Sequence, residues 1–113
     1  MTPETMLTVL QEGEVALFIA MFTKFTALDD TFVRRMLFEH DGNALAITCK
    51  AGGIGKAIFA SIFALTRRPQ KMSEKEIRGE TRKCLAVYNK TSREAAMETV
   101  RRWQANNTVG MAT

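Results

Sequence analysis

The sequence has few of the residues that disulfide scaffolds, metal sites and interrupted helices require. Its 113 residues include two cysteines, two prolines and one histidine. Cys49 and Cys84 have no partner motif around them, which predicts two buried thiols in a reducing cytoplasm rather than a disulfide. His40 has no second His or Cys at ligand spacing, which argues against a zinc site. The scarcity of proline, with much Ala, Leu, Met, Lys, Arg and Glu, favours an all-α fold.

Long hydrophobic runs are also missing. The two longest, residues 15–22 and 57–65, are far shorter than the roughly 20 apolar residues that cross a bilayer. The first residues carry Glu4 where a secretory signal has a basic segment, so we expect no such signal. The composition, 46% hydrophobic and 25% charged, is typical of a folded domain rather than a disordered chain. We therefore expect one cytoplasmic domain over residues 1–105, without a membrane segment.

A short phrase occurs twice in the chain. Residues 16–22 read ALFIAMF and residues 57–63 read AIFASIF, an offset of 41 that repeats one alanine and two phenylalanines. Stacked helical units bury one face against the next with such helices. The phrase predicts a bundle of about seven helices with HEAT-like character, in two units over about residues 14–51 and 55–105. Two readings of the repeat stay open: a true duplication, or two similar buried helices in one bundle.

Local signals place the helix ends. Thr2 and Pro3 predict an N-cap and a first helical residue, and Asp29 predicts the N-cap of a later helix. Ser73 to Glu76 and Thr91 to Glu94 have the spacing of capping boxes. The helix over about 14–27 is apolar nearly all round in its first turns, which predicts a buried central helix. Residues 106–113 lack periodicity, and we expect a disordered tail there.

Motifs for chemistry are weak. The segment Gly53-Ile54-Gly55-Lys56 fails as a phosphate loop, because Lys50 stands where the first glycine is needed and Ala57 where Ser or Thr is needed. Neither cysteine has an evident base beside it. We therefore expect no enzyme activity, no catalytic residue, no cofactor and no bound metal.

Charge is distributed unequally along the chain. Residues 1–66 hold five Lys and Arg against seven Asp and Glu, a net charge of −2, and residues 67–113 hold eleven against five, or +6. The basic half suits an acidic partner, and Trp103 would add an aromatic if the 67–71 and 101–102 clusters met in space. We expect Trp103 itself to pack into the core, with its N–H at the edge. We expect partner binding at basic residues in both halves: Arg34, Arg35, Arg67, Arg68, Lys71, Arg101 and Arg102.

Three groups of residues resemble a known family. They are Leu10-x-x-Gly13 followed by Leu17-Phe18, then Asp30-x-x-Val33, then Tyr88-Asn89-x-x-Ser92-x-Glu94-Ala95 running to Trp103. Over about residues 5–104 the chain resembles the C-terminal portion of an uncharacterised alphaproteobacterial family, domain of unknown function 2336. The resemblance implies an α-helical, repeat-like, cytoplasmic interaction module, and it supplies no catalytic residues.

Two functions follow from these observations. The first is a non-enzymatic helical module that binds another protein, either in a longer array or by pairing with itself through apolar faces rich in Met and Phe. The alternative is a small basic regulator that binds nucleic acid through the 67–71 and 101–102 clusters. A helix-turn-helix over 73–105 is disfavoured, because the second helix opens with Glu94 and Glu98, which repel phosphates.

Overall fold

A computed structural model describes residues 2–38, 41–67 and 72–112, and it confirms the all-α prediction. Seven helices and no strands occur within these ranges. The helices are α1 (Pro3–Gln11), α2 (Val15–Thr26), α3 (Asp30–Phe38), α4 (Asn43–Ala51), α5 (Lys56–Arg67), α6 (Glu74–Lys90) and α7 (Arg93–Ala112). α7 continues as helix beyond residue 105, where the sequence predicts a tail.

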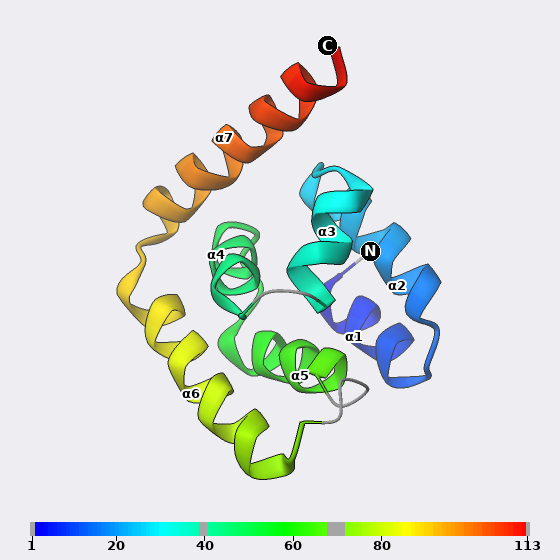
Figure 1. Cartoon of the computed structure of the whole chain (residues 1–113), viewed down its shortest axis with the longest axis vertical. Coiled ribbons are helices and arrows are strands. Elements are labelled where there is room, and N and C mark those ends of the chain that lie inside the picture. Colours follow the sequence, from blue (N-terminus) through cyan, green and yellow to red (C-terminus); the bar gives the residue numbers. More distant parts are fainter. Residues whose placement is uncertain (1, 39–40, 68–71, 113) are drawn as a thin grey trace.

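The helices surround α4 and α5 (Figure 1). α1, α2 and α3 lie on one side of this pair, and α6 and α7 form an arm on the other side. α4 packs against α5, α6 and α7, while α5 packs against α1, α3, α4 and α6. The main neighbours of α2 are α1 and α3. α2 is therefore a peripheral helix, and α5 is a central one.

Most of the predicted helix starts are confirmed. Thr2 accepts a hydrogen bond from the backbone N–H of Thr5 at 3.2 Å, with Pro3 in the first turn. Asp29 Oδ2 accepts hydrogen bonds from the N–H groups of Thr31 at 3.0 Å and Phe32 at 3.3 Å. Such caps satisfy backbone donors that the first turn of a helix leaves without partners.

One of the two predicted capping boxes forms and the other does not. Ser73 accepts from the N–H of Glu76, and the Glu76 carboxylate accepts from the N–H of Ser73. At the start of α7 it is Ser92, not Thr91, that accepts a hydrogen bond, from the N–H of Ala95 at 3.1 Å. The Thr91 hydroxyl donates instead to the carbonyl oxygen of Val87 in the last turn of α6. The predicted Thr91–Glu94 box is thus wrong, because Thr91 ends the preceding helix.

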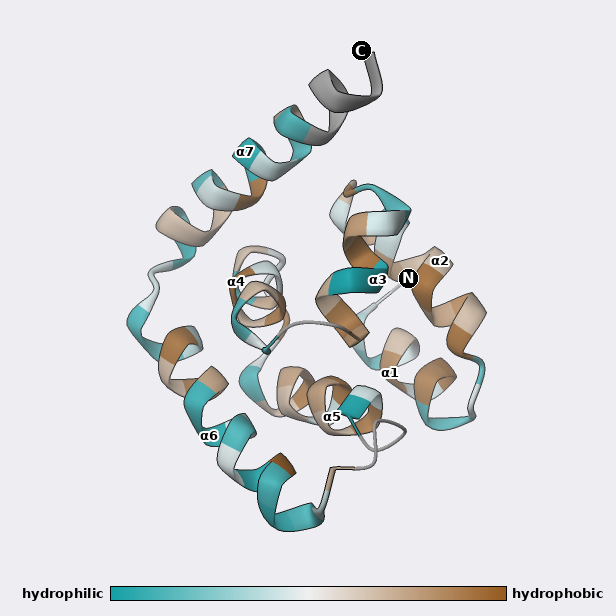
Figure 2. Cartoon of the chain, viewed as in Figure 1, coloured by the Kyte–Doolittle hydropathy of each residue, from teal (hydrophilic) through white to brown (hydrophobic). Residues whose placement is uncertain are grey.

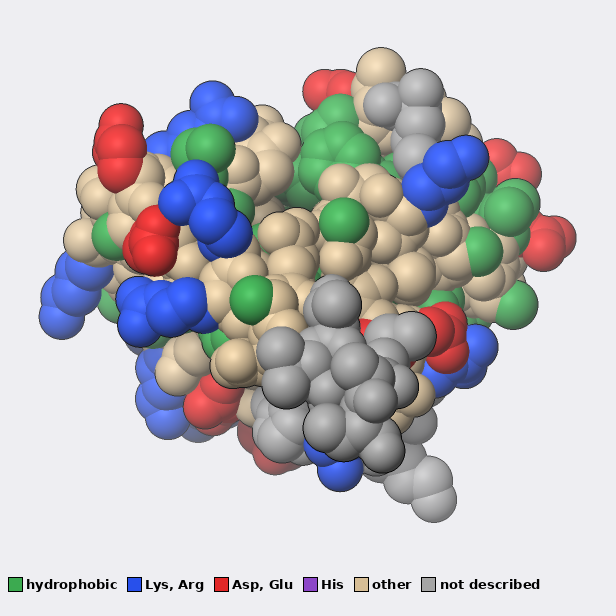
Figure 3. Space-filling view, turned by 90° about the horizontal axis from the view of Figure 1, so that it is seen from above, with side chains coloured by type: hydrophobic (Ala, Val, Ile, Leu, Met, Phe, Trp, Pro, Cys, Tyr) green, Lys and Arg blue, Asp and Glu red, His purple; other side chains and the backbone are tan. Residues whose placement is uncertain are grey.

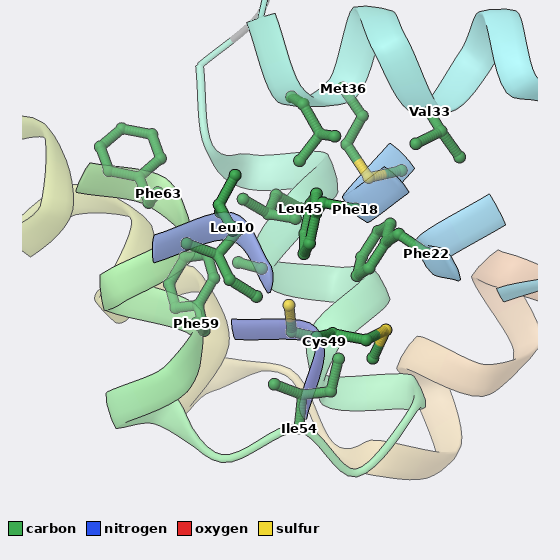
Figure 4. Packing of buried hydrophobic residues seen from close by; sticks show 14 of the residues in the cluster. Leu10, Phe18, Phe22, Val33, Met36, Leu45, Cys49, Ile54, Phe59 and Phe63 are labelled. Carbon is green, nitrogen blue, oxygen red and sulfur yellow. The ribbon is translucent and has the colours of Figure 1, made fainter. Parts of the chain in front are cut away.

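Four phenylalanines from the two copies of the phrase form the centre of the core. Phe18, Phe22, Phe59 and Phe63 are all fully buried. In Figure 4, Phe22 of α2 and Phe59 of α5 lie on opposite sides of a group of α4 side chains. Each buried phenylalanine contributes roughly 1.5–3 kcal/mol relative to an exposed one, so these rings are the main apolar contribution of their helices. Both copies are helical and both bury their phenylalanines, as the repeated phrase predicts.

The two ends of α4 carry features that tie the bundle together. Ile54 in the turn between α4 and α5 is fully buried, and its carbonyl oxygen accepts a hydrogen bond from the Tyr88 hydroxyl of α6 at 2.7 Å. Before α4, Gly42 lies so close to its neighbours that an added Cβ would come within 2.3 Å of Cys84 Sγ and 2.7 Å of the Phe63 ring. α4 therefore approaches α5 and α6 at a distance that only glycine permits at this position.

The prediction that α2 is buried all round is wrong. Leu17 is 50% exposed and Val15 is 41% exposed, and Ala16 and Ala20 are also exposed. Figure 2 shows α2 in hydrophobic colours along nearly all of its length, while α6 on the opposite side carries long hydrophilic stretches. α2 has a core-facing side built from Phe18, Ile19 and Phe22, and an opposite side that no described element covers.

Candidate functional site

The described basic residues among those predicted to bind a partner lie on three helices, α3, α5 and α7. Arg34 pairs with Asp30 at 2.8 Å within α3, and both side chains are half exposed. Arg101 pairs with Glu98 at 2.7 Å within α7. Exposed pairs of this kind typically contribute less than about 1 kcal/mol. Arg35 and Arg102 are exposed. Arg68 and Lys71 lie outside the described residues.

Arg67 differs from the sequence expectation, because it is interior. Its side chain is 3% exposed, its Nη1 donates a hydrogen bond to the carbonyl oxygen of Leu37 in the last turn of α3, and its guanidinium carbon lies 4.5 Å from the centre of the Phe63 ring. Burial lowers the pKa of Arg67, while nearby groups including Cys84 and Asp41 act to raise that pKa. An arginine stays protonated under such shifts. Arg67 therefore holds the C-terminal end of α3 to α5 and is not a surface cation.

Trp103 lies in a hollow between α3, α4 and α7. The hollow has a volume of about 210 Å³ and is lined by Phe32, Arg35, Met36, Ala44 and Trp103. The Phe32 and Trp103 rings are 5.2 Å apart and tilted by 43°. Trp103 is partly buried and packs against the core, as the sequence predicts, and its neighbours in the hollow are Phe32 and Arg35 rather than Arg101 and Arg102. Sequence neighbours on a helix point in different directions, which explains this difference.

A second hollow, of about 240 Å³, lies between α2, α4 and α7. Phe25, Ala51 and Val100 form apolar walls, and two polar side chains at its rim already have partners. Gln104 Nε2 donates to the carbonyl oxygen of Thr26 at 2.7 Å, and Arg101 is paired with Glu98. The rim thus joins α7 to the end of α2. We find no set of polar groups here that converges on a ligand.

The titratable groups of the interior are poorly suited to nucleophilic chemistry. Cys49 and Cys84 are both buried, and burial raises the pKa of each thiol. The thiolate is the nucleophilic form, so both cysteines are held in the unreactive form at neutral pH. Within the described ranges, no group of three or more His, Cys, Asp or Glu side chains is placed to hold a metal ion. No described helix is long and apolar enough to cross a membrane.

Two of the three large hydrophobic side chains that are exposed among the described residues, Val15 and Leu17, belong to α2. We define the α2 outer face as Ala16, Leu17, Ala20 and Met21, which the helical period places on one side. Ala16, Leu17 and Ala20 are exposed, and Met21 is partly buried. Figure 3 shows hydrophobic side chains at the edge of the molecule on the side where α2 lies, with acidic side chains beside them. A helix that is apolar all round is normally buried on all sides.

The second copy of the phrase provides an internal reference for this face. Ile58 of α5 corresponds to Leu17, and it is partly buried and packs against the core. Ile62 corresponds to Met21, and it is fully buried. Ala57, the counterpart of Ala16, is exposed in α5 as well, so the two faces differ at the larger side chains, which are more covered in α5 than in α2.

The sequence did not lead to the α2 outer face as a predicted site, although the absence of charged residues in this stretch is a signal for such a face. Residues 15–23 contain no charged side chain. By itself, such a stretch predicts a buried central helix. An uncharged helical stretch at the edge of a bundle instead indicates an exposed apolar face that a partner can cover.

Comparisons with known proteins give one result. Searches of curated proteins and of solved structures found no match. One family model, described as an uncharacterised protein conserved in bacteria, matches residues 1–101, which is most of the chain and agrees with the resemblance seen in the sequence. The chain therefore belongs to this bacterial family, DUF2336.

Proposed function

We propose that this protein is a non-enzymatic helical module that binds another protein chain, and that the partner packs on the α2 outer face. One observation carries this proposal: Leu17 is 50% exposed in the middle of a helical stretch without any charge. A single exposed leucine is ordinary, but an outer helix whose first two turns lack charge is not. Covering this face would remove the exposed part of Leu17 from water, with smaller contributions from Ala16, Ala20 and the partly buried Met21; full burial of an exposed leucine contributes roughly 1.5–3 kcal/mol.

We further propose that the fold has HEAT-like packing of two three-helix units, α2–α4 and α5–α7. The equivalent buried phenylalanines of α2 and α5 support this, and so does the packing of α4 against α7, the third helices of the two units. In a stack of such units, each layer covers the apolar face of the next one. The α2 outer face is then the position at which a further helical surface adds to the stack.

Photo-crosslinking in the bacterial host tests this proposal. A photoreactive phenylalanine analogue replaces Leu17 in one variant and Lys83 in a control variant. Lys83 is exposed on α6, on the opposite side of the bundle (Figure 1). We expect a discrete protein adduct from position 17 and none from position 83, with the bound chain identified by mass spectrometry. No adduct at position 17, or the same adducts from both positions, contradicts the proposal.

A further inference from the structure

Charged residues of opposite sign flank the α2 outer face. Glu12 and Glu14 are exposed just before the helix, and Lys24 is exposed near its end. None of the three makes an ion pair with another residue in the described part of the chain. Glu14 is the N-cap residue, but its side chain makes no capping hydrogen bond. These charges are thus free to meet groups on a partner.

From this arrangement we infer that the partner is a second copy of this chain, bound through α2 helices that run antiparallel about a two-fold axis. This inference rests on the proposed function and names the chain that covers the face. A two-fold interface brings the same surface of both copies together, so the surface must complement itself. The α2 outer face does so, because each end carries the charge that the other end lacks.

One antiparallel register pairs apolar residues with apolar residues and opposite charges with each other. In an antiparallel pair, the numbers of two opposed residues have a constant sum. The register that places Glu14 opposite Lys24 of the copy also places Leu17 opposite Met21 of the copy. At 1.5 Å per residue, Glu14 and Lys24 lie about 15 Å apart along the helix, so the contact extends over almost three turns. The small side chains of Ala16 and Ala20 leave room between the larger ones, as holes do for knobs in packed helices.

The contact between two α2 helices is small. A helix of 12 residues is about 18 Å long, and one pair of such helices buries area at the low end of specific interfaces, below roughly 1,200 Å² in total. We therefore expect a weak dimer that forms in the range of about 10–100 µM. The charges favour the antiparallel arrangement over a parallel one, since a parallel pair would bring the glutamates of the two copies together.

Sedimentation velocity on the full chain, from about 5 to about 500 µM and at low and high salt, tests the inference. We expect the wild type to shift from monomer to dimer over this range. Leu17→Glu should abolish the dimer, because it places two carboxylates against the apolar side chains of the copy. Far-UV circular dichroism checks that each variant folds, and Ala20→Glu is a second disruptive variant on the same face.

Charge exchange tests the register and the orientation. Lys24→Glu should weaken the dimer about tenfold, since the symmetry repeats the unfavourable contact twice. The double variant Glu14→Lys/Lys24→Glu should restore the dimer, because the two charges are exchanged within one register. Lys83→Glu, on α6, is the matched control and should leave the dimer unchanged. A double variant as weak as Lys24→Glu alone overturns the antiparallel register.

The outcomes separate this inference from the proposed function. A wild type that stays monomeric at every concentration overturns the dimer, and so does a dimer that persists in both Leu17→Glu and Ala20→Glu. If position 17 crosslinks to a different protein while the chain sediments as a monomer, the proposed function stands and the second copy is the wrong partner. A crosslink to this chain itself, together with the charge-exchange rescue, supports both.

Discussion

Replacing Tyr88 by phenylalanine would remove one hydrogen-bonding oxygen from the junction between the two halves of the bundle. The Tyr88 hydroxyl donates to the carbonyl oxygen of Ile54 at 2.7 Å, and Ile54 is fully buried in the turn between α4 and α5. The Tyr88 ring also stacks on Phe59 at 5.8 Å, and Lys50 Nζ lies 4.5 Å from its centre. Phenylalanine keeps both ring contacts, so the substitution isolates the hydrogen bond.

The expected loss of stability comes from the Ile54 carbonyl oxygen, which is left without its hydrogen-bond donor. A buried carbonyl that loses its donor costs about 1–3 kcal/mol, more than the net value of an ordinary exchanged hydrogen bond. Tyr88 is 9% exposed, so some water reaches the site and we expect a loss in the lower half of that range, about 1.5 kcal/mol. With an unfolding entropy of about 2.1 cal/mol/K per residue over 113 residues, this corresponds to a fall in Tm of about 6 °C.

Urea unfolding followed by the fluorescence of Trp103, the single tryptophan, measures this difference. Thr99→Val is a suitable control, because the Thr99 hydroxyl donates only to the carbonyl of Ala95 on the solvent-facing side of α7. We expect the control to change the unfolding free energy by less than about 0.5 kcal/mol. If Tyr88→Phe were as stable as the control, the Ile54 carbonyl would have another partner, and the argument for this tie would be refuted.

Alkaline pH provides a second test of the same hydroxyl. Burial raises the pKa of Tyr88, with a further contribution from Cys49 and an opposing one from Arg93. A raised pKa in the folded state means that folding favours the neutral phenol. This stabilisation is complete below the pKa of an unfolded tyrosine, about 10, and is lost as the pH rises through the folded-state pKa. The stability advantage of the wild type over Tyr88→Phe should therefore shrink above about pH 10. Tyr88 is the only tyrosine, so phenolate absorbance reports its titration directly.

Three further substitutions test the packing. Gly42→Ala should destabilise the fold by about 1–3 kcal/mol, because the added Cβ has no room. The control Gly55→Ala, whose Cβ would meet nothing within 4 Å, should be neutral or slightly stabilising, and equal effects of the two substitutions in thermal unfolding would contradict the close approach at Gly42. Phe18→Ala should cost about 3–5 kcal/mol by urea unfolding, and its neighbour Leu17→Ala less than about 1 kcal/mol; comparable losses would mean that both face the core. Arg67→Met should lower the free energy of unfolding by roughly 1.5–3 kcal/mol, because the Leu37 carbonyl at the end of α3 loses a charged hydrogen-bond donor. Unchanged stability in chemical unfolding would place the guanidinium at the surface.

Features set by neighbours in sequence could be predicted from sequence alone. The caps at Thr2, Asp29 and Ser73 involve residues within three positions of each other, so the chain determines them whatever the rest of the fold does. The number of helices and the burial of the repeated phenylalanines follow from the helical period and from the apolar area of these rings. The cap at Thr91 was mispredicted because Thr91 and Ser92 offer two similar local solutions, and the geometry of the preceding helix selects between them.

The candidate site, in contrast, was decided by tertiary structure. Arg67 and Arg34 look alike in sequence, but one is enclosed by α3, α5 and their neighbours while the other points to water. Leu17 and Ile58 hold equivalent positions in the repeated phrase, and only the packing around α5 covers the second of them. The helical period determines which side of a helix is apolar. Whether another element covers that side depends on contacts between residues far apart in the chain, and this information is absent from any local pattern.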